Sequence, residues 1–334
     1  MSGRLGITIP LPGVPLADHQ DWLRRLVDLG FSDCWTMETT GFDAFTPLAL
    51  AAAWAPELRL GTAIASVFSR GPALLAQTAA GVADAAPGRF VLGLGSSSET
   101  MSQSWNDVVF ERPYARVRDS LHFLRRAMEG ERIDTDYESF SCHGFQLDRA
   151  PAQPPPIYLA ALRRDMLRLA ARQADGVLLS LVGAADLEPI RAVLSEAAPD
   201  RASSTPERDI VLRLGVMPIA DAERCRDLGR RTLAAYLSVP AYAQMMEWLG
   251  HAELLAPMVH AWQSGDRRAA VAAVPDALVD ALFVHGSAPA CREQLQAFQA
   301  AGVSTPVVSL MNLGPGAYDV ARVLEEMAGA GPGR

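Results

Sequence analysis

The stretch Arg89-Phe-Val-Leu-Gly-Leu-Gly-Ser-Ser-Ser98 is the part of the sequence that indicates the fold most directly. Residues 90–94 contain no polar side chain and no in/out alternation, which is typical of a parallel strand covered on both faces. Gly95 and three serines follow where this strand ends. The carboxyl ends of strands carry the chemistry in a parallel barrel, so small residues there would let a planar or anionic ligand approach the backbone. The alternative is a tight turn whose serines cap the next helix.

Strand and helix patterns alternate on both sides of this stretch. Apolar strand patterns are centred near residues 5, 33, 60, 91, 157, 177, 212 and 307, and a helical pattern follows each of them. Such alternation predicts parallel strands joined by right-handed helical crossovers. Eight units in one run favour an α/β fold of the (β/α)8 TIM-barrel type over two nucleotide-binding domains.

Two interruptions break the pattern, one after the fourth strand and one between the seventh and eighth strands. The first comprises residues 99–112 and 131–150, with a predicted hairpin over 133–147, and the second is a mostly helical region over 238–285. We expect both to be insertions that shape one pocket on a single domain of residues 1–328. Residues 329–334 are expected to form a flexible C-terminal tail.

Composition and short motifs exclude several classes of function. The net charge of −8 argues against nucleic-acid binding, which needs a basic surface. The four cysteines form no CxxC and the six histidines no HExxH, so we expect neither a disulfide framework nor a metal site. No GxGxxG opens a helix after the first strand, a P-loop is impossible without lysine, and GxSxG is absent. The sequence lacks a signal-peptide core and a membrane-spanning apolar run, so we expect a cytoplasmic protein without a membrane partner.

A series of motifs occurs in a fixed order from residue 5 to about residue 325. The motifs are Gly30-Phe31 with the strand to Glu38, Leu60-Gly-Thr62, Gly88 to Ser97, Trp105, Phe110 to Arg116, Pro155 to Ala161, Leu169-Ala170 and Ala174-Asp-Gly-Val177. This series resembles the bacterial luciferase-like flavin and deazaflavin oxidoreductases. Its 157–170 and 93–97 segments are most similar to the branch that uses coenzyme F420, an 8-hydroxy-5-deazaflavin, and FMN is the alternative cofactor.

The resemblance implies where the cofactor binds. It implies a TIM barrel with the cofactor across the carboxyl ends of the strands, and a bulged third strand with a non-prolyl cis peptide bond near Ala63-Ile64 behind the flavin ring. The site after the fourth strand would contact the ribityl chain or phosphate. Its residues are Gly95, Ser96, Ser97 and Ser98.

The end of the fifth strand is a second candidate cofactor site. Ala160-Ala161-Leu162-Arg163 ends this strand and opens a helix. The N-terminal amides of a helix and its macrodipole favour phosphate, and Arg163 and Arg164 would add positive charge for a phosphate or a polyglutamate tail. The alternative is a pair of solvated arginines.

Candidate catalytic and substrate-binding residues lie in the loops after the second and fourth strands. Glu38 and Thr39 end the second strand, where a carboxylate could contact the ring or act as an acid or base; the alternative is a capping or ion-paired glutamate. Several relatives have a histidine and a glutamate where this chain has Thr39 and Ser98, so their sugar-phosphate dehydrogenase activity is not carried over. Trp105 and Phe110 would line the substrate pocket, or pack the insertion onto the barrel.

The resemblance implies an F420-dependent oxidoreductase that transfers a hydride between C5 of the deazaflavin and a small, apolar organic substrate. One alternative is an FMN-dependent monooxygenase that uses reduced flavin and oxygen. A second is a barrel that binds flavin without catalysis. Dimers are common in the family, so a homodimer is an expected assembly.

Overall fold

The computed structural model describes residues 3–198, 208–314 and 316–328. The tail expected at 329–334 lies outside the described residues. Eight parallel strands form the closed barrel that the sequence predicts, at all eight expected positions. In chain order they are β1 (Gly6–Thr8), β2 (Asp33–Thr36), β3 (Arg59–Thr62), β5 (Phe90–Gly95), β8 (Ile157–Ala160), β9 (Gly176–Ser180), β10 (Asp209–Met217) and β12 (Thr305–Leu310).

Each strand pairs in parallel with the next, and β12 pairs with β1 to close the sheet. Two short strands supplement the barrel. β4 (Ala65–Ser66) continues the line of β3 after a break and pairs with β5, and β11 (Phe283–His285) pairs with the end of β10.

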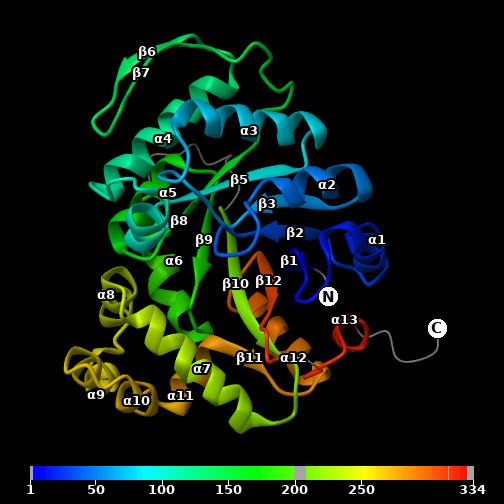
Figure 1. Ribbon diagram of the computed structural model, residues 1–334, viewed down its shortest axis with the longest axis vertical. Helices are drawn as coiled ribbons and strands as arrows, with labels where there is room; N and C mark the ends of the chain where they lie inside the picture. The colour runs from blue at the N-terminus through cyan, green and yellow to red at the C-terminus, as the bar shows by residue number, and fades with distance from the viewer. Residues whose placement is uncertain (1–2, 199–207, 315, 329–334) are drawn as a thin grey trace.

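Helices surround the strands (Figure 1). They bury apolar side chains against the outward face of the sheet, which is why every strand is covered on both sides. Their bounds are α1 (His19–Asp28), α2 (Thr46–Trp54), α3 (Pro72–Ala85), α4 (Pro113–Met128), α5 (Arg164–Gln173), α6 (Leu187–Glu196), α7 (Ala222–Leu237), α12 (Ala288–Ala300) and α13 (Val320–Ala328), with 3-10 turns η1 (Leu16–Asp18) and η3 (Ala184–Asp186).

The barrel interior holds a small cluster of its own, which we call the inner cluster. Trp35 and Tyr158 are its largest members, with ring centroids 6.4 Å apart. Its remaining buried members are Val91, Leu178, Val211 and Val307. Because side chains alternate along a strand, residues two positions away from these also face the interior.

The interior is polar beneath the inner cluster, at the amino ends of the strands. Arg59 pairs with Asp33 and with Asp209, the latter at 3.0 Å, and it donates to the Thr305 hydroxyl at 3.0 Å. The Tyr158 hydroxyl donates to Asp209, and burial raises the pKa of Tyr158 well above its usual range. A paired ionic network therefore closes this end of the barrel.

The two insertions lie in different places. The hairpin of β6 (Ile133–Asp136) and β7 (Ser141–Phe145) follows α4, when the chain has already left the carboxyl ends of the strands. It packs on the outer side of α4, where the Phe123 ring lies 5.6 Å from Phe145 and 6.0 Å from Phe140 (Figure 1). The expectation that both insertions shape one pocket is thus wrong for the hairpin.

The second insertion is helical, as predicted. It comprises α8 (Pro240–Trp248), α9 (Ala252–Gln263), α10 (Arg267–Ala272) and α11 (Asp276–Leu282), and leads into β11. Within the described residues, no helix is long and apolar enough to span a bilayer.

Candidate active site

Residues from three strands meet at the carboxyl end of the barrel interior. Ala63, Ile64 and Ala160 pack on the inner cluster and remain half-exposed, unlike the buried members of that cluster. The peptide bond between Ala63 and Ile64 is cis and lies in the break between β3 and β4, as the sequence resemblance implied. These side chains form a small apolar surface that faces away from the packed interior.

Gly95 lies in the middle of this surface. A Cβ atom added to Gly95 would lie 3.0 Å from Ile64 Cγ1 and 3.1 Å from Ala160 Cβ, so the expected residues 63–64, 95 and 160 are direct neighbours. Gly93 has a different role, because a Cβ there would lie 1.8 Å from the carbonyl oxygen of Thr62. Close strand packing therefore requires Gly93, whereas Gly95 keeps the surface flat.

The three serines after β5 line the edge of this surface. All are half-exposed, and Ser97 has a left-handed backbone with φ 60°. The Ser97 hydroxyl contacts Met101 Sδ at 3.0 Å, and the Ser98 hydroxyl accepts from the Met101 amide at 3.3 Å. Ser98 thus caps the π-helical turn η2 (Thr100–Ser104), as the capping alternative expected. Within the described residues, the Ser96 hydroxyl donates only to the Ser97 carbonyl, at 3.4 Å.

The end of β8 and the start of α5 place two arginines beside the second insertion. Arg163 donates to Gln244 Oε1 at 2.8 Å, and the Arg164 guanidinium lies 5.9 Å from the Trp248 ring centroid. Both partners are neutral, so they leave the positive charges uncompensated. The Ala161 amide donates to the Leu178 carbonyl at 3.1 Å and is occupied, so an anion here would bind the first amides of α5 instead.

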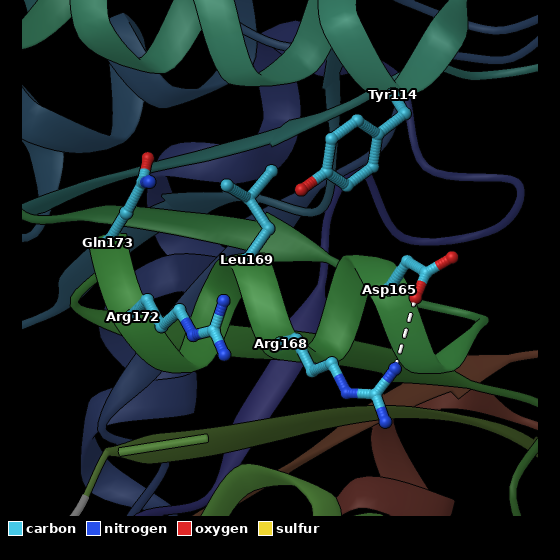
Figure 2. Close-up of a pocket in the computed structure, with 6 residues that line it drawn as sticks. All are labelled: Tyr114, Asp165, Arg168, Leu169, Arg172 and Gln173. Atoms are coloured by element: carbon cyan, nitrogen blue, oxygen red, sulfur yellow. Dashed lines mark hydrogen bonds and ion pairs between the residues drawn. The ribbon is translucent and has the colours of Figure 1, made fainter. Parts of the chain in front are cut away.

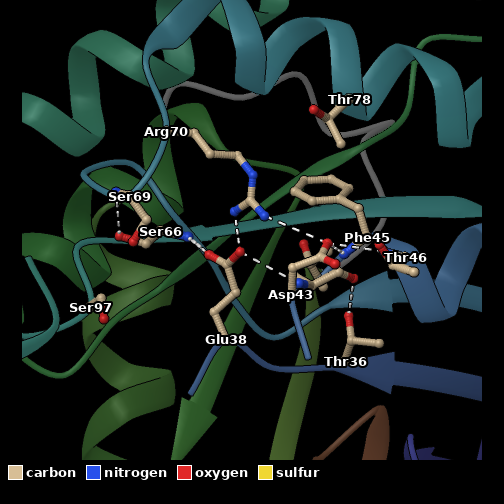
Figure 3. Close-up of polar contacts among 12 residues, drawn as sticks. Thr36, Glu38, Asp43, Phe45, Thr46, Ser66, Ser69, Arg70, Thr78 and Ser97 are labelled. Carbon is tan, nitrogen blue, oxygen red and sulfur yellow. Dashed lines mark hydrogen bonds and ion pairs between the residues drawn. The ribbon is translucent and has the colours of Figure 1, made fainter. Parts of the chain in front are cut away.

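Glu38 is part of an ion pair and a hydrogen-bond network, shown in Figure 3. Its carboxylate pairs with Arg70 and accepts from the Ser66 amide at 2.9 Å. The side chains of Glu38 and Arg70 are only 9% and 14% exposed, and Arg70 also lies 3.6 Å from Asp43. Glu38 therefore joins the loop after β2 to the loop after β4, which agrees with the ion-paired alternative.

The other three predicted side chains in these loops are more open. Thr39 is exposed beside Glu38. Trp105 is 51% exposed after η2. Phe110 is half-buried with its ring centroid 4.7 Å from that of Phe68, so it packs the insertion onto the barrel.

Sequence reasoning missed a polar group on the opposite side of the barrel. Arg213, on β10, donates to Ser309 Oγ of β12 and reaches Met37 Sδ after β2, each at 3.3 Å. Strand parity places it inside the barrel once Val211 is known to face the interior, because Arg213 lies two residues from Val211 of the inner cluster.

The second insertion covers the neighbouring part of this end. Tyr242 of α8 forms a side-chain hydrogen bond with Ser180 of β9, and its ring centroid lies 5.1 Å from that of Tyr236. Burial raises the pKa of Tyr242. The insertion therefore places the phenol of Tyr242 at Ser180, within electrostatic range of Arg213.

Two surface grooves lie away from this site. One, of about 350 Å³, lies between α4 and α5, where Arg168 pairs with Asp165 at 3.2 Å (Figure 2). The other, of about 340 Å³, lies between α3 and residues 146–149 after the hairpin. Neither contains a predicted site residue. In the described part of the chain no cluster of three or more metal-binding side chains was found.

Comparison with known proteins places this barrel in a family. The sequence profile of the luciferase-like monooxygenase family matches residues 3–305. A putative coenzyme F420-dependent oxidoreductase from Mycobacterium tuberculosis is 27% identical over 331 residues, covering 92% of this chain and 94% of that protein.

Solved structures share the fold over nearly the whole chain. The F420-dependent tetrahydromethanopterin reductase of Methanopyrus kandleri superimposes with a TM-score of 0.78 at 20% identity, covering 98% of both chains. The FMN complex of a type II Baeyer–Villiger monooxygenase from Pseudomonas putida gives 0.65 at 18% identity, covering 98% of this chain and 97% of that one. The chain belongs to the luciferase-like monooxygenase family, a family of TIM-barrel oxidoreductases, as the sequence resemblance indicated.

Proposed function

We propose that this protein is an F420-dependent oxidoreductase that acts on a small organic substrate. The observation that carries this proposal is the half-exposed surface of Ala63, Ile64 and Ala160 around Gly95, at the carboxyl ends of the strands. A planar ring needs such a flat apolar surface, and barrel enzymes hold their ligands at this end. The similarity to F420-dependent relatives supports the deazaflavin over other planar cofactors.

The residues around this surface fit the remaining parts of F420. Ser96, Ser97 and Ser98 offer hydroxyl groups to a ribityl chain. The first amides of α5, with Arg163 and Arg164, offer positive potential to a phosphate and to an acidic tail. When bound, F420 supplies a carbon centre that accepts or donates a hydride, while the protein provides position and electrostatics.

Glu38 and Thr39 remain our candidates for polar groups that contact the substrate or the ring. With Arg70 and the Ser66 amide as partners, Glu38 serves as a hydrogen-bond acceptor that positions the loop after β4. Trp105 is a candidate for a wall of the substrate site, because its ring is exposed in the loop that follows the serines. We further propose that the substrate is a small molecule with an apolar body. We also propose that the protein assembles as a homodimer.

An FMN-dependent monooxygenase is the second candidate. The FMN-bound monooxygenase from Pseudomonas putida shares the fold over nearly the same length. The higher TM-score of the F420-dependent reductase favours the deazaflavin.

The test is a titration of the purified protein with F420 and, separately, with FMN, followed by cofactor fluorescence and ring absorbance. We expect F420 to bind at least ten times more tightly than FMN. Gly95→Val should weaken F420 binding, because its added methyl groups would occupy the flat surface, and Gly81→Ala on the outer helix α3 is the matched control. Preference for FMN would support the monooxygenase, and binding of neither would contradict both candidates.

A further inference from the structure

Among the described residues, Arg213 of the barrel interior has no acidic partner. Val211 and Val307 belong to the inner cluster, and Arg213 and Ser309 follow them by two residues on β10 and β12. Side chains two positions apart share a face of a strand, so both point into the barrel, one layer nearer its carboxyl end. The contacts of Arg213 with Ser309 and Met37, each at 3.3 Å, agree with this position.

Thr8 adds an unsatisfied hydroxyl to this layer. A Cβ on Gly6 would lie 3.0 Å from the Trp35 ring, so Gly6 faces the interior, and Thr8 shares its face of β1. β1 lies between β12, which carries Ser309, and β2, which is followed by Met37. Thr8 Oγ1 is buried and has no hydrogen-bond partner among the described residues, which is uncommon for a buried hydroxyl and leaves it available to a ligand group.

Each end of the barrel interior contains an arginine, and the two ends differ in whether an acidic side chain neutralises its positive charge. At the amino end, Arg59 is paired with both Asp33 and Asp209. At the carboxyl end, no Asp or Glu of the described chain forms an ion pair with Arg213. The groups that face Arg213 are neutral: the thioether of Met37, the hydroxyl of Ser309 and the phenol of Tyr242.

An uncompensated, half-buried guanidinium is costly unless an anion joins it. Arginine presents a planar fork of donors that matches a carboxylate, and the hydroxyls of Thr8 and Ser309 add further donors to the same layer. We propose that Arg213, Thr8 and Ser309 bind the carboxylate of the substrate, so that the enzyme acts on small organic acids. This inference rests on the proposed function, because it assumes that the substrate reacts at this end of the barrel.

The position of Arg213 favours the substrate over the cofactor as the source of the anion. The proposed ring surface is built from β3, β4, β5 and β8, whereas Arg213 is on β10 and contacts β12 and the end of β2. In the closed order of strands, β10 and β12 lie opposite β3 and β5. A substrate bound between the ring surface and Arg213 would have its apolar body near the cofactor and its carboxylate at the guanidinium.

The test measures binding of simple carboxylates by calorimetry, with and without F420. Acetate, butyrate and benzoate are the probes, and benzamide is the neutral analogue of benzoate. We expect at least one carboxylate to bind, and Arg213→Leu to weaken it about 10- to 100-fold while benzamide is unaffected. Arg213→Lys should give an intermediate loss, because the point charge remains without the fork. Arg268→Leu, at an exposed position on α10, is the control and should change nothing.

The same samples are titrated with F420, which separates this inference from the proposed function. Unchanged F420 affinity in Arg213→Leu, together with lost carboxylate binding, supports a substrate site; circular dichroism verifies that the variant is folded. Equal loss of F420 affinity would overturn the inference, because the anion would then belong to the cofactor. Failure of all three carboxylates to bind the unmodified protein, or full binding by Arg213→Leu, would also overturn it. Carboxylate binding that needs Arg213 without any F420 binding would retain the anion site and contradict the proposed cofactor.

Discussion

Glu38 illustrates how a single residue can be found from sequence while its environment is not. The pattern of a strand ending in an acid placed Glu38 at the carboxyl end of the barrel, which is correct. Its partner Arg70 follows β4 and is distant in the sequence, so the ion pair could be stated only as one of several alternatives. Arg213 was missed for a related reason, because which face of β10 points inward depends on its neighbours in the closed sheet.

The pair of Glu38 and Arg70 should contribute to stability as a unit. Glu38→Gln leaves Arg70 with only the more distant Asp43, so we expect the free energy of unfolding to fall by about 1–3 kcal/mol. Arg70→Gln should cost a similar amount. The double variant should lose less than the sum, with a coupling energy of about 1–3 kcal/mol in urea denaturation. Strictly additive losses would show that the two side chains do not stabilise each other.

The eight barrel strands and most outer helices could be predicted from sequence because their apolar patterns are long and repeat in order. Short elements were harder to predict. β4 has two residues and continues the bulged third strand that the resemblance implied, so the sequence did not separate it from β3, and β11 has three residues at the end of the predicted second insertion. The hairpin was predicted at the right residues. Its position on the outside of the barrel was not predicted, because its packing on Phe123 is a tertiary contact. α2 begins at Thr46, and the carboxylate of Asp43, three residues earlier, accepts from the Thr46 amide at 3.0 Å.

Two glycines in different elements should respond in opposite directions to the same substitution. Gly81 lies inside α3, and an added Cβ would meet nothing within 4 Å, so Gly81→Ala should raise the free energy of unfolding by about 0.5–1 kcal/mol. Gly93→Ala should lower it by several times that amount, because its Cβ would overlap the Thr62 carbonyl. Urea denaturation of both variants provides the measurement. Equal effects would contradict the packing described for β3 and β5.

On the scale of the whole molecule, the barrel interior is divided into a paired amino end, an apolar middle and an open carboxyl end. Stability is concentrated at the amino end, as expected for a TIM barrel, and the proposed chemistry lies at the opposite end. This separation lets the loops and the second insertion vary without disturbing the ionic network of Arg59. The sequence predicted the barrel and the end that holds the site, whereas the division of charge along its interior required the strand register.

The ionic network should make Arg59 one of the least replaceable residues of the protein. Arg59→Met leaves Asp33, whose side chain is fully buried, with only the more distant and half-exposed Arg4 as a counter-charge, at 3.4 Å, and we expect the free energy of unfolding to fall by about 3–5 kcal/mol. Arg24→Met is the control, because its pair with Asp21 is exposed to solvent and worth about 0–1 kcal/mol. Chemical denaturation of the two variants gives the comparison. A loss for Arg59→Met no larger than that of the control would refute a stabilising role for the network.

A crystal structure of the complex with F420 tests the central claim most directly. We predict that the deazaflavin ring lies against Ile64, Gly95 and Ala160, with its chain along Ser96 to Ser98 and its phosphate at the start of α5. Arg213 should remain free to bind a substrate on the other side of the ring. A cofactor bound elsewhere, such as in the groove between α4 and α5, or a ring that leaves Ile64 and Gly95 uncovered, would contradict the account.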